Sequence, residues 1–315
     1  MKKRYILAGI GGIAGATIAY KLAKRPQNID WERKTAGLPF ADKSRFVEVD
    51  GVKIHYQEFG DANAPPVLMI HGYSASTFTW NNAAPKLANK GFRVLVVDLI
   101  GFGFSEKPFW HDYTIDGQAR MISRLMNRLG IGQATIVGSS YGGAVAAILA
   151  LDYPERISKL VLVSAVSNDG IKNSPLTTLA TTPFVGGVLA PLLVSSKTYI
   201  KIRLRNSLNA TNYYLIDDNR LDSIMRPLVS ADSHNALIAT LKNWHANRIE
   251  RDAHQINAPT LLIWGENDKI VPLRNGEKLH NEIEDSRLVI FKNCGHVPHE
   301  EFTDDFVNLV TDFAE

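Results

Sequence analysis

The chain lacks residues on which several protein classes depend. It has one cysteine, Cys294, among 315 residues, which excludes an internal disulfide and a zinc site made of cysteine ligands. A protein without disulfides works in either redox setting, so this absence leaves the compartment open. Low-complexity runs and fixed-period repeats are also missing. With 45% hydrophobic and 21% charged residues, the composition is that of an ordinary globular protein.

Strong charge is missing as well. The net charge is +3, but residues 1–25 carry six basic side chains and no acidic one, so the remaining 290 residues sum to −3. Because no basic stripe interleaved with aromatic residues follows, we predict no nucleic-acid partner. The histidines show no metal-ligand spacing, and GIGGIA (residues 9–14) lacks the acidic residue that a dinucleotide fingerprint has about 20 positions on. The sequence therefore predicts neither a metal nor a cofactor.

The N-terminal segment contains an uncharged stretch between two basic clusters. A bilayer span takes ~17–25 mainly apolar residues, and residues 5–23 reach that length if Lys21 extends to the interface. The sequence favours an uncleaved anchor, and a cleaved signal peptide with its site at AGA (14–16) stays open. We therefore predict membrane association through residues 5–23 and a membrane-anchored or exported protein, in the inner membrane or periplasm if the source is a bacterium.

The most informative stretch is IVGSSYGG, which contains Ser140. A strand over residues 134–138 is followed by a helix over residues 142–151, with Ser140 at the break. Gly138 and Gly142 flank it in the pattern Gly-x-Ser-x-Gly and remove the Cβ atoms that would collide in so tight a turn. This is the arrangement of a nucleophile elbow, so the sequence predicts Ser140 as a nucleophile.

Strands and helices alternate from residue 46 to the end of the chain. Short continuous apolar runs indicate strands buried on both faces, as in a parallel sheet covered by helices, and Asp50-Gly51 indicates a hairpin. The sequence therefore predicts an α/β fold with a doubly wound sheet. The expected strands are residues 46–49, 53–57, 67–70, 94–97, 160–163 and 260–263, and the expected helices are residues 80–90, 115–129, 142–151 and 303–313.

Almost a hundred residues separate the strand that ends at Val163 from the one that begins at Thr260. A structureless loop of that length is uncommon in a compact domain, so we predict a helical cap, followed by a longer helix over residues 233–248 that returns to the core. The predicted regions are an anchor or signal (1–25), a polar linker (26–45), the core (46–166 and 229–315) and the cap (167–228). Apolar cap residues expected either to contact substrate or to pack on the core are Phe184, Val185, Leu189, Leu192 and Leu193.

A nucleophilic serine needs a histidine base, and the histidine needs an orienting acid, in the chain order Ser, Asp or Glu, His. Asp268 comes just after one buried strand and His296 just after the next. We therefore predict Asp268 as the acid and His296 as the base. The alternatives are Glu266 and Asp169 for the acid and His299 for the base. We expect His299, with the two glutamates after it, at a solvated helix start.

Negative charge on the carbonyl oxygen in the transition state requires waiting backbone N–H donors. The amide of Tyr141, directly after the nucleophile, is the first predicted donor. The second is the amide of Tyr73 in the loop HGYS, where Gly72 lets the backbone turn toward the nucleophile. We expect His71 to shape this loop rather than to act in catalysis.

With these residues in place, the chain from Val47 to its end resembles the α/β-hydrolase superfamily. The resemblance implies a mostly parallel eight-stranded sheet flanked by helices, with a helical cap insertion. Within the superfamily the chain is similar to serine esterases and monoacylglycerol-lipase-like enzymes, which implies a triad of Ser140, Asp268 and His296. The segments that carry the resemblance are HGYSAS (71–76), DLIGFGFSEKP (98–108), GSSYGG (138–143), WGENDKIVP (264–272) and NCGHVPHEE (293–301).

The sequence thus predicts a hydrolase that cleaves carboxylic esters through an acyl-enzyme. Its expected small-molecule substrates are apolar acyl esters or monoacylglycerol-like lipids. Carbon–carbon bond hydrolases of meta-cleavage products share the framework and are the alternative, although HGYSAS lacks the glycine- and proline-bearing loop usual in that subclass. A hydrolase-fold receptor without turnover is the third hypothesis. The cap sets the substrate, and it carries no motif that distinguishes these three.

Overall fold

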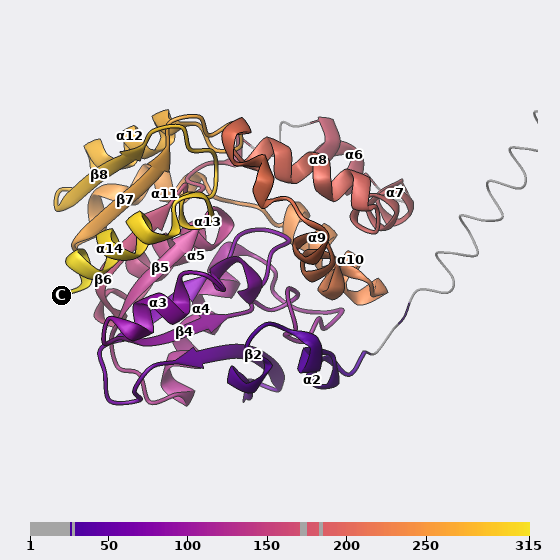
Figure 1. Ribbon diagram of the computed structural model, residues 1–315, viewed down its shortest axis with the longest axis horizontal. Helices are drawn as coiled ribbons and strands as arrows, with labels where there is room; N and C mark the ends of the chain where they lie inside the picture. Colours follow the sequence, from indigo (N-terminus) through magenta and orange to yellow (C-terminus); the bar gives the residue numbers. More distant parts are fainter. Residues whose placement is uncertain (1–25, 27–28, 171–174, 183–184) are drawn as a thin grey trace, which may run out of the picture.

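An eight-stranded, mostly parallel sheet organises the molecule (Figure 1). The computed structural model describes residue 26 and residues 29–170, 175–182 and 185–315. The strand order is β1-β2-β4-β3-β5-β6-β7-β8; β2 pairs antiparallel with β1 and β4, and the other pairs are parallel. The predicted fold class is therefore confirmed. The strands are β1 Ser44–Val49, β2 Val52–Phe59, β3 Pro66–Ile70, β4 Arg93–Val97, β5 Ala134–Ser139, β6 Ile157–Val163, β7 Thr260–Gly265 and β8 Ser286–Phe291.

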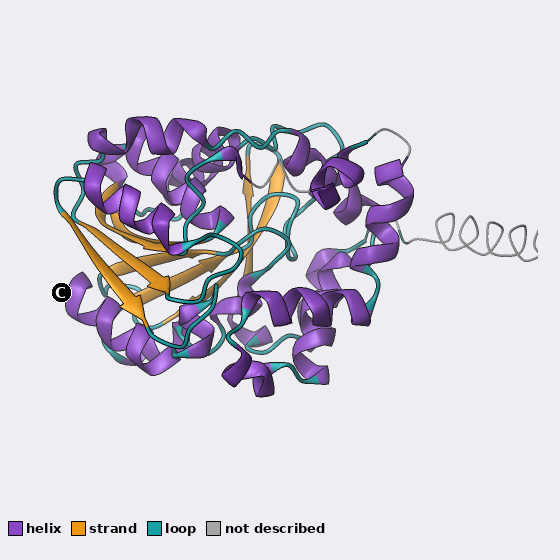
Figure 2. Cartoon of the chain, turned by 90° about the horizontal axis from the view of Figure 1, so that it is seen from above, coloured by secondary structure: helices purple, strands orange, loops and turns teal. Residues whose placement is uncertain are grey.

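Helices cover both faces of this sheet (Figure 2). Alternate residues of a buried strand point to opposite faces, so β3 places Leu68 and Ile70 in the layer with α4 and α5, and Val67 and Met69 in the layer with α3 and α14. The α-helices are α2 Trp31–Lys34, α3 Ala84–Asn89, α4 Ile115–Arg128, α5 Tyr141–Asp152, α6 Pro175–Thr181, α7 Val185–Val194, α8 Lys197–Ser207, α9 Asp218–Met225, α10 Ala231–Lys242, α11 Asn247–Asp252, α12 Leu273–Glu282, α13 Pro298–Glu301 and α14 Thr303–Ala314. Short 3-10 helices span Thr35–Gly37, Ala41–Lys43, Thr77–Trp80, Pro154–Arg156, Ala210–Leu215, Arg226–Leu228 and Ala253–Gln255.

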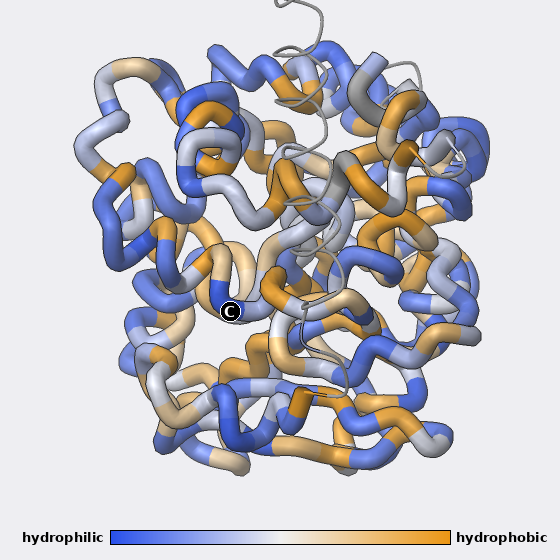
Figure 3. The backbone as a smooth tube through the Cα atoms, turned by 90° about the vertical axis from the view of Figure 1, so that its right-hand side faces the viewer, coloured by the Kyte–Doolittle hydropathy of each residue, from blue (hydrophilic) through white to orange (hydrophobic). Residues whose placement is uncertain are grey.

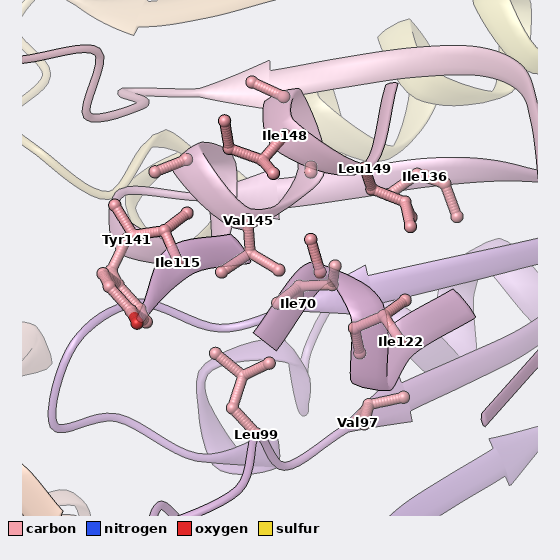
Figure 4. Close-up of a cluster of buried hydrophobic side chains, with 14 of the residues drawn as sticks. Ile70, Val97, Leu99, Ile115, Ile122, Ile136, Tyr141, Val145, Ile148 and Leu149 are labelled. Atoms are coloured by element: carbon pink, nitrogen blue, oxygen red, sulfur yellow. The ribbon is translucent and has the colours of Figure 1, made fainter. Parts of the chain in front are cut away.

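The larger core layer lies between the sheet and helices α4 and α5 (Figure 4). Ile70 and Ile136 on the neighbouring strands β3 and β5 face Ile122 of α4 and Val145 and Ile148 of α5. Every residue of α5 from its first to its tenth position is buried, as expected for a helix that is apolar all round. The helix that begins directly after Ser140 is thus fixed by packing on all its sides.

The segment predicted as a polar linker, residues 26–45, contains α2 and buries Trp31. The Trp31 ring packs edge-on against Phe104, with ring centroids 6.1 Å apart, and Lys107 Nζ lies 3.5 Å from the Trp31 ring centroid. Aromatic and cation–π contacts of this kind each contribute stability beyond burial of area. They fasten the segment before β1 to the loop that follows β4.

Between β6 and β7 the helices α6 to α10 gather on one side of the molecule, at the right of Figure 1. Figure 3 views that side and shows hydrophobic and hydrophilic residues interleaved along the helices. The single helix expected over residues 233–248 is divided: α10 ends at Lys242 and α11 begins at Asn247. Asp169 Oδ1 accepts the amide of Ala246 at 2.6 Å, which holds the chain at this break. The cap bounds of 167–228 stay a prediction.

Residues 1–25, with the expected anchor, lie outside the described residues. In the ranges that the structure describes, no helix combines the length and the apolarity needed to cross a bilayer.

Ile148 offers a direct test of the α5 layer. The side chain is fully buried, and removal of buried methylenes leaves a cavity that costs about 2–5 kcal/mol in Ile→Ala substitutions. We expect Ile148→Ala to lower the free energy of unfolding by that amount in urea denaturation. Ile290→Ala on β8 is the matched control because Ile290 is 43% exposed, and it should change stability by less than about 1 kcal/mol. Equal losses in the two variants would contradict the packing described.

Candidate active site

Ser140 occupies a strained break between β5 and α5. Its φ of 54° and ψ of −114° lie in a region that residues with a side chain rarely adopt. A Cβ atom at Gly138 would lie 2.3 Å from the carbonyl oxygen of Gly142, and one at Gly142 would lie 2.4 Å from the carbonyl oxygens of Ile70 and His71. Both glycines are therefore required by close backbone approach, as the sequence predicted. The close contact at Gly142 joins the turn at Ser140 to the end of β3.

The predicted acid and base are brought together. Asp268 follows β7 and His296 follows β8, and His296 Nδ1 donates to Asp268 Oδ2 at 2.8 Å. The other carboxylate oxygen accepts the amides of Ile270 and Val271 at 2.8 and 2.9 Å. These three donors hold the buried carboxylate as an acceptor. With Nδ1 committed to Asp268, His296 Nε2 is the ring nitrogen left to act as a base.

The rival acids make other contacts. Glu266 is exposed, and its Oε2 accepts the amide of Asn293 at 3.4 Å. Asp169 accepts the amide of Ala246 instead. Of the three candidate acids, Asp268 is therefore the one in hydrogen-bond contact with His296.

The loop of Tyr73 passes directly over the nucleophile. A Cβ atom at Gly72 would lie 3.2 Å from Ser140 Cβ and 3.7 Å from Ser140 Oγ. Tyr141 follows Ser140 in the chain, so the amides of both predicted oxyanion donors belong to segments that adjoin Ser140. The Tyr73 hydroxyl donates to the carbonyl of Leu237 at 3.0 Å. The Tyr73 side chain therefore has a structural role. The donor roles of the two amides stay predictions.

His71 holds this loop from inside the protein. Its Nδ1 donates to the Gly72 carbonyl at 2.8 Å, and its Nε2 accepts the amide of Leu99 at 3.2 Å. Burial lowers the pKa of His71, against the opposing charge of Asp98, which favours the neutral ring. Asp98 itself is fully buried and accepts the Thr77 amide at 2.6 Å. His71 therefore shapes the loop, as expected from the sequence.

The segment after His296 differs from the prediction. His299 was expected at a solvated helix start, but it is 1% exposed and stacks on Trp80 with ring centroids 4.2 Å apart. Its Nε2 is 3.1 Å from Thr79 Oγ1, and burial lowers its pKa to about 3. Glu301 is also buried and accepts the amides of Gly295 and Asn209, each at 2.8 Å. The expectation of a solvated cluster was wrong, because these side chains fasten the His296 loop.

The cap is joined to the same loop. The amide of His296 donates to the carbonyl of Ser207, the last residue of α8, at 2.6 Å. Asn212 Nδ2 donates to Glu301 at 2.7 Å. No pattern in the sequence indicates these contacts, since they join segments nearly ninety positions apart. His296, the predicted base, is thus positioned by both the core and the cap.

Ser140 and His296 line one cavity of about 1050 Å³ between the sheet and the cap. Its walls are mainly apolar. Among the expected cap residues whose side chains the structure describes, Leu193 contributes to them. Val185 is exposed, and Phe184 lies outside the described residues. Within the part of the chain that the structure describes, no cluster of histidine, cysteine or acidic side chains could hold a metal ion. The site offers a serine, an oriented imidazole and a largely apolar chamber.

Comparison with known proteins gives consistent matches. Residues 65–303 match a family model described as alpha/beta hydrolase fold. A 2-hydroxy-6-oxo-6-phenylhexa-2,4-dienoate hydrolase of Comamonas testosteroni is 32% identical and covers 82% of this chain and 90% of its own. A 2-hydroxy-6-oxononadienedioate/2-hydroxy-6-oxononatrienedioate hydrolase of Pseudomonas putida is 30% identical over 86% and 96%. A solved membrane phospholipase A, described as a bacterial virulence factor, is 26% identical with a TM-score of 0.71, over 99% and 97%.

The predicted membrane-anchored or exported location is wrong. The hydrolases of Pseudomonas putida and Comamonas testosteroni, which match most of this chain, give it no support. The prediction depended on the apolarity of residues 5–23. Apolarity measures how readily a segment leaves water, and contact with a bilayer or with a protein surface is favourable for the same reason. Apolarity alone therefore does not indicate a membrane location.

The acid assignment can be tested by Asp268→Asn. The amide cannot hold the imidazole in the same tautomer or stabilise its protonated form, and the loss of kcat in serine hydrolases is about 10⁴-fold. We expect a fall of about that order in the kcat of hydrolysis. Glu266→Gln is the matched control, since Glu266 is exposed and bonded elsewhere. A larger loss at Glu266 than at Asp268 would contradict the assignment.

The burial of His299 predicts a pH dependence of stability. Its folded pKa of about 3 lies below the ordinary value of 6.5, so the folded state excludes a proton that the unfolded state binds. Stability is then fully present above pH ~6.5 and is lost as the pH falls toward ~3, by at most about 1.4 kcal/mol per pH unit. We expect His299→Gln to flatten the slope of unfolding free energy between about pH 4.5 and 6.5 in urea titrations. The control is His280→Gln, because His280 is exposed, and this variant should show the same slope as the parent protein. An unchanged slope in His299→Gln would refute the buried placement of His299.

Proposed function

This chain belongs to the α/β-hydrolase family, and from that premise we propose that it is a serine hydrolase that cleaves carboxylic esters with apolar acyl groups. Ser140 attacks the ester carbonyl while His296 accepts its proton. Asp268 orients the imidazole and stabilises its protonated form. The amides of Tyr73 and Tyr141 donate to the oxyanion. Collapse of the tetrahedral intermediate releases the alcohol, and water then cleaves the acyl-enzyme by the same steps.

The observation that carries this proposal is the hydrogen bond between Asp268 and His296 beside an elbow serine in one cavity. A hydrogen-bonded acid and base need a nucleophile within reach, and Ser140 is exposed to the same chamber. The strain at Ser140 points the same way, since strained backbone clusters at functional sites. These observations support a site for acyl transfer.

Two observations favour an ester with an apolar acyl group. The chamber of about 1050 Å³ is large enough for a long chain, and its walls include Leu193, Leu237 and Leu241. A solved membrane phospholipase A matches this chain with a TM-score of 0.71. A phospholipase cleaves acyl esters, so this likeness supports ester chemistry.

Carbon–carbon bond hydrolysis of meta-cleavage products is the second candidate. The curated relatives favour it over ester hydrolysis, because both are hydrolases of 2-hydroxy-6-oxo dienoates. The same serine and oxyanion donors can act on a ketone carbonyl. The two candidates therefore differ in the leaving group and not in the attacking residue.

Ser140→Ala tests the nucleophile for both candidates. We expect the substitution to lower hydrolysis by at least about 10³-fold, with the thermal unfolding transition unchanged within a few degrees. Ser195→Ala is the matched control, because Ser195 is exposed at the end of α7 and outside the cavity lining. Retained activity in Ser140→Ala would exclude the proposed mechanism.

The substrate class is decided by one panel assayed with the parent protein. It contains p-nitrophenyl esters of increasing acyl length, monoacylglycerols, and 2-hydroxy-6-oxo-6-phenylhexa-2,4-dienoate. A kcat/KM that rises with acyl length and exceeds that for the dienoate supports the ester proposal. A dienoate kcat/KM above all esters supports the second candidate, and absence of turnover on every member would favour a receptor.

A further inference from the structure

Helix α8 presents one face to the catalytic cavity. At about 100° per residue, the α8 residues that line the cavity fall on one side of the helix. They are Tyr199, Ile200, Arg203, Leu204, Asn206 and Ser207. The opposite side carries exposed residues such as Arg205. Arg203 is the one charged side chain that α8 contributes to the cavity wall. A guanidinium in an otherwise uncharged helix face calls for a physical reason.

The Arg203 guanidinium has no hydrogen-bond or ion-pair partner among the residues that the structure describes. Two other cations of the cavity wall differ in this respect. Arg220 is paired with Glu300, and Lys278 is paired with Glu250 at 2.7 Å. Arg203 is also partly buried, and removal of a cation from water costs free energy unless an anion or a set of acceptors compensates for it.

Arg203 lines the same cavity as Ser140 and His296. Ser207, one helical turn further on, donates its hydroxyl to the Arg203 carbonyl at 3.0 Å and accepts the amide of His296. On the other side of the cavity, burial raises the pKa of the Tyr73 hydroxyl, and the positive charge of Arg203 opposes this rise. The guanidinium is therefore within electrostatic reach of the loop that carries the Tyr73 amide.

The other unpaired charges of the cavity wall are also positive. Arg274 and Lys269 are exposed at the wall, and the acidic member of the lining, Glu300, is already paired with Arg220. A cleft lined by one sign of charge raises the local concentration of ligands of the opposite sign. An anionic ligand is attracted to this cavity before it reaches Arg203.

We propose that Arg203 binds an anionic oxygen group of the substrate, a carboxylate or a phosphate, while Ser140 attacks the carbonyl of the same molecule. A planar guanidinium can donate two parallel hydrogen bonds to either group. The inference rests on the proposed serine-hydrolase function and narrows it from apolar esters to esters that also carry a negative charge. Arg203 is in this role a specificity-determining residue and takes no part in proton transfer.

The test compares charged substrates with neutral twins. The carboxylate arm uses a mono-p-nitrophenyl ester of a dicarboxylic acid against the same compound with its free acid methylated. The phosphate arm uses a lysophosphatidylglycerol against the monoacylglycerol of the same chain. We expect Arg203→Gln to lower kcat/KM for at least one charged substrate about tenfold or more, and for the neutral twins by less than about twofold. The arm that responds identifies the anion, and Arg203→Lys should restore part of the loss.

The matched control is Arg205→Gln, which removes the same charge from the exposed side of α8. Equal losses of kcat/KM in the Arg203 and Arg205 variants would overturn the proposal, because they would reflect the overall positive charge of the protein and not a contact made by Arg203. Equal losses on charged and neutral substrates would overturn it too, because they would report a structural role.

Binding without turnover separates this inference from the proposed function. The monomethyl ester of the dicarboxylic acid is titrated calorimetrically into Ser140→Ala and into the double variant with Arg203→Gln. Weaker binding in the double variant by about tenfold supports the Arg203 site even if the parent hydrolyses none of the four substrates, a result that would defeat only the proposed function. Equal binding in the two proteins, together with hydrolysis that ignores Arg203, overturns the Arg203 site alone.

Discussion

The arrangement of the site depends on the close backbone contact between the elbow at Ser140 and the end of β3. No Cβ atom fits at Gly142, because the carbonyl oxygens of Ile70 and His71 occupy that space. This contact brings the loop after β3 over Ser140. The predicted nucleophile and the loop that carries the Tyr73 amide are therefore placed together because the ends of β3 and β5 lie in contact. The buried helix α5 then holds the strained φ of Ser140 in place, since its residues are packed on every side.

His296, the predicted base, is positioned by hydrogen bonds, whereas Ser140 is positioned by backbone packing. His296 lies on a loop and not at a helix terminus, and its position is fixed by hydrogen bonds from three directions. Asp268 holds the ring, the Ser207 carbonyl accepts the amide, and Glu301 holds the preceding Gly295 amide while it also accepts donors from the cap. A buried carboxylate with several donors is costly to leave half-satisfied, so this network favours one loop conformation.

Sequence patterns predicted the parts of the site that local structure controls. The glycine spacing around Ser140 and the strand ends before Asp268 and His296 are readable because each is fixed within a few residues. The burial of His299 and Glu301 was not readable, since these residues are polar and their partners, Thr79 and Asn209, are distant in the chain. The Arg203 face was equally hidden, because a helix pattern shows which residues share a side but not what that side meets.

The cap and the catalytic loop cannot be treated as independent modules. Helix α8 supplies both the carbonyl that accepts the His296 amide and the face that lines the cavity. A change that shifts α8 to fit a different ligand would therefore also move the hydrogen-bond partner of the base. In the proposed mechanism, core geometry places the attacking atom and α8 shapes the ligand site. The hydrogen bond between Ser207 and His296 makes these two properties respond together. Selection of substrate in this fold is thus limited by how far α8 can move without loss of the base.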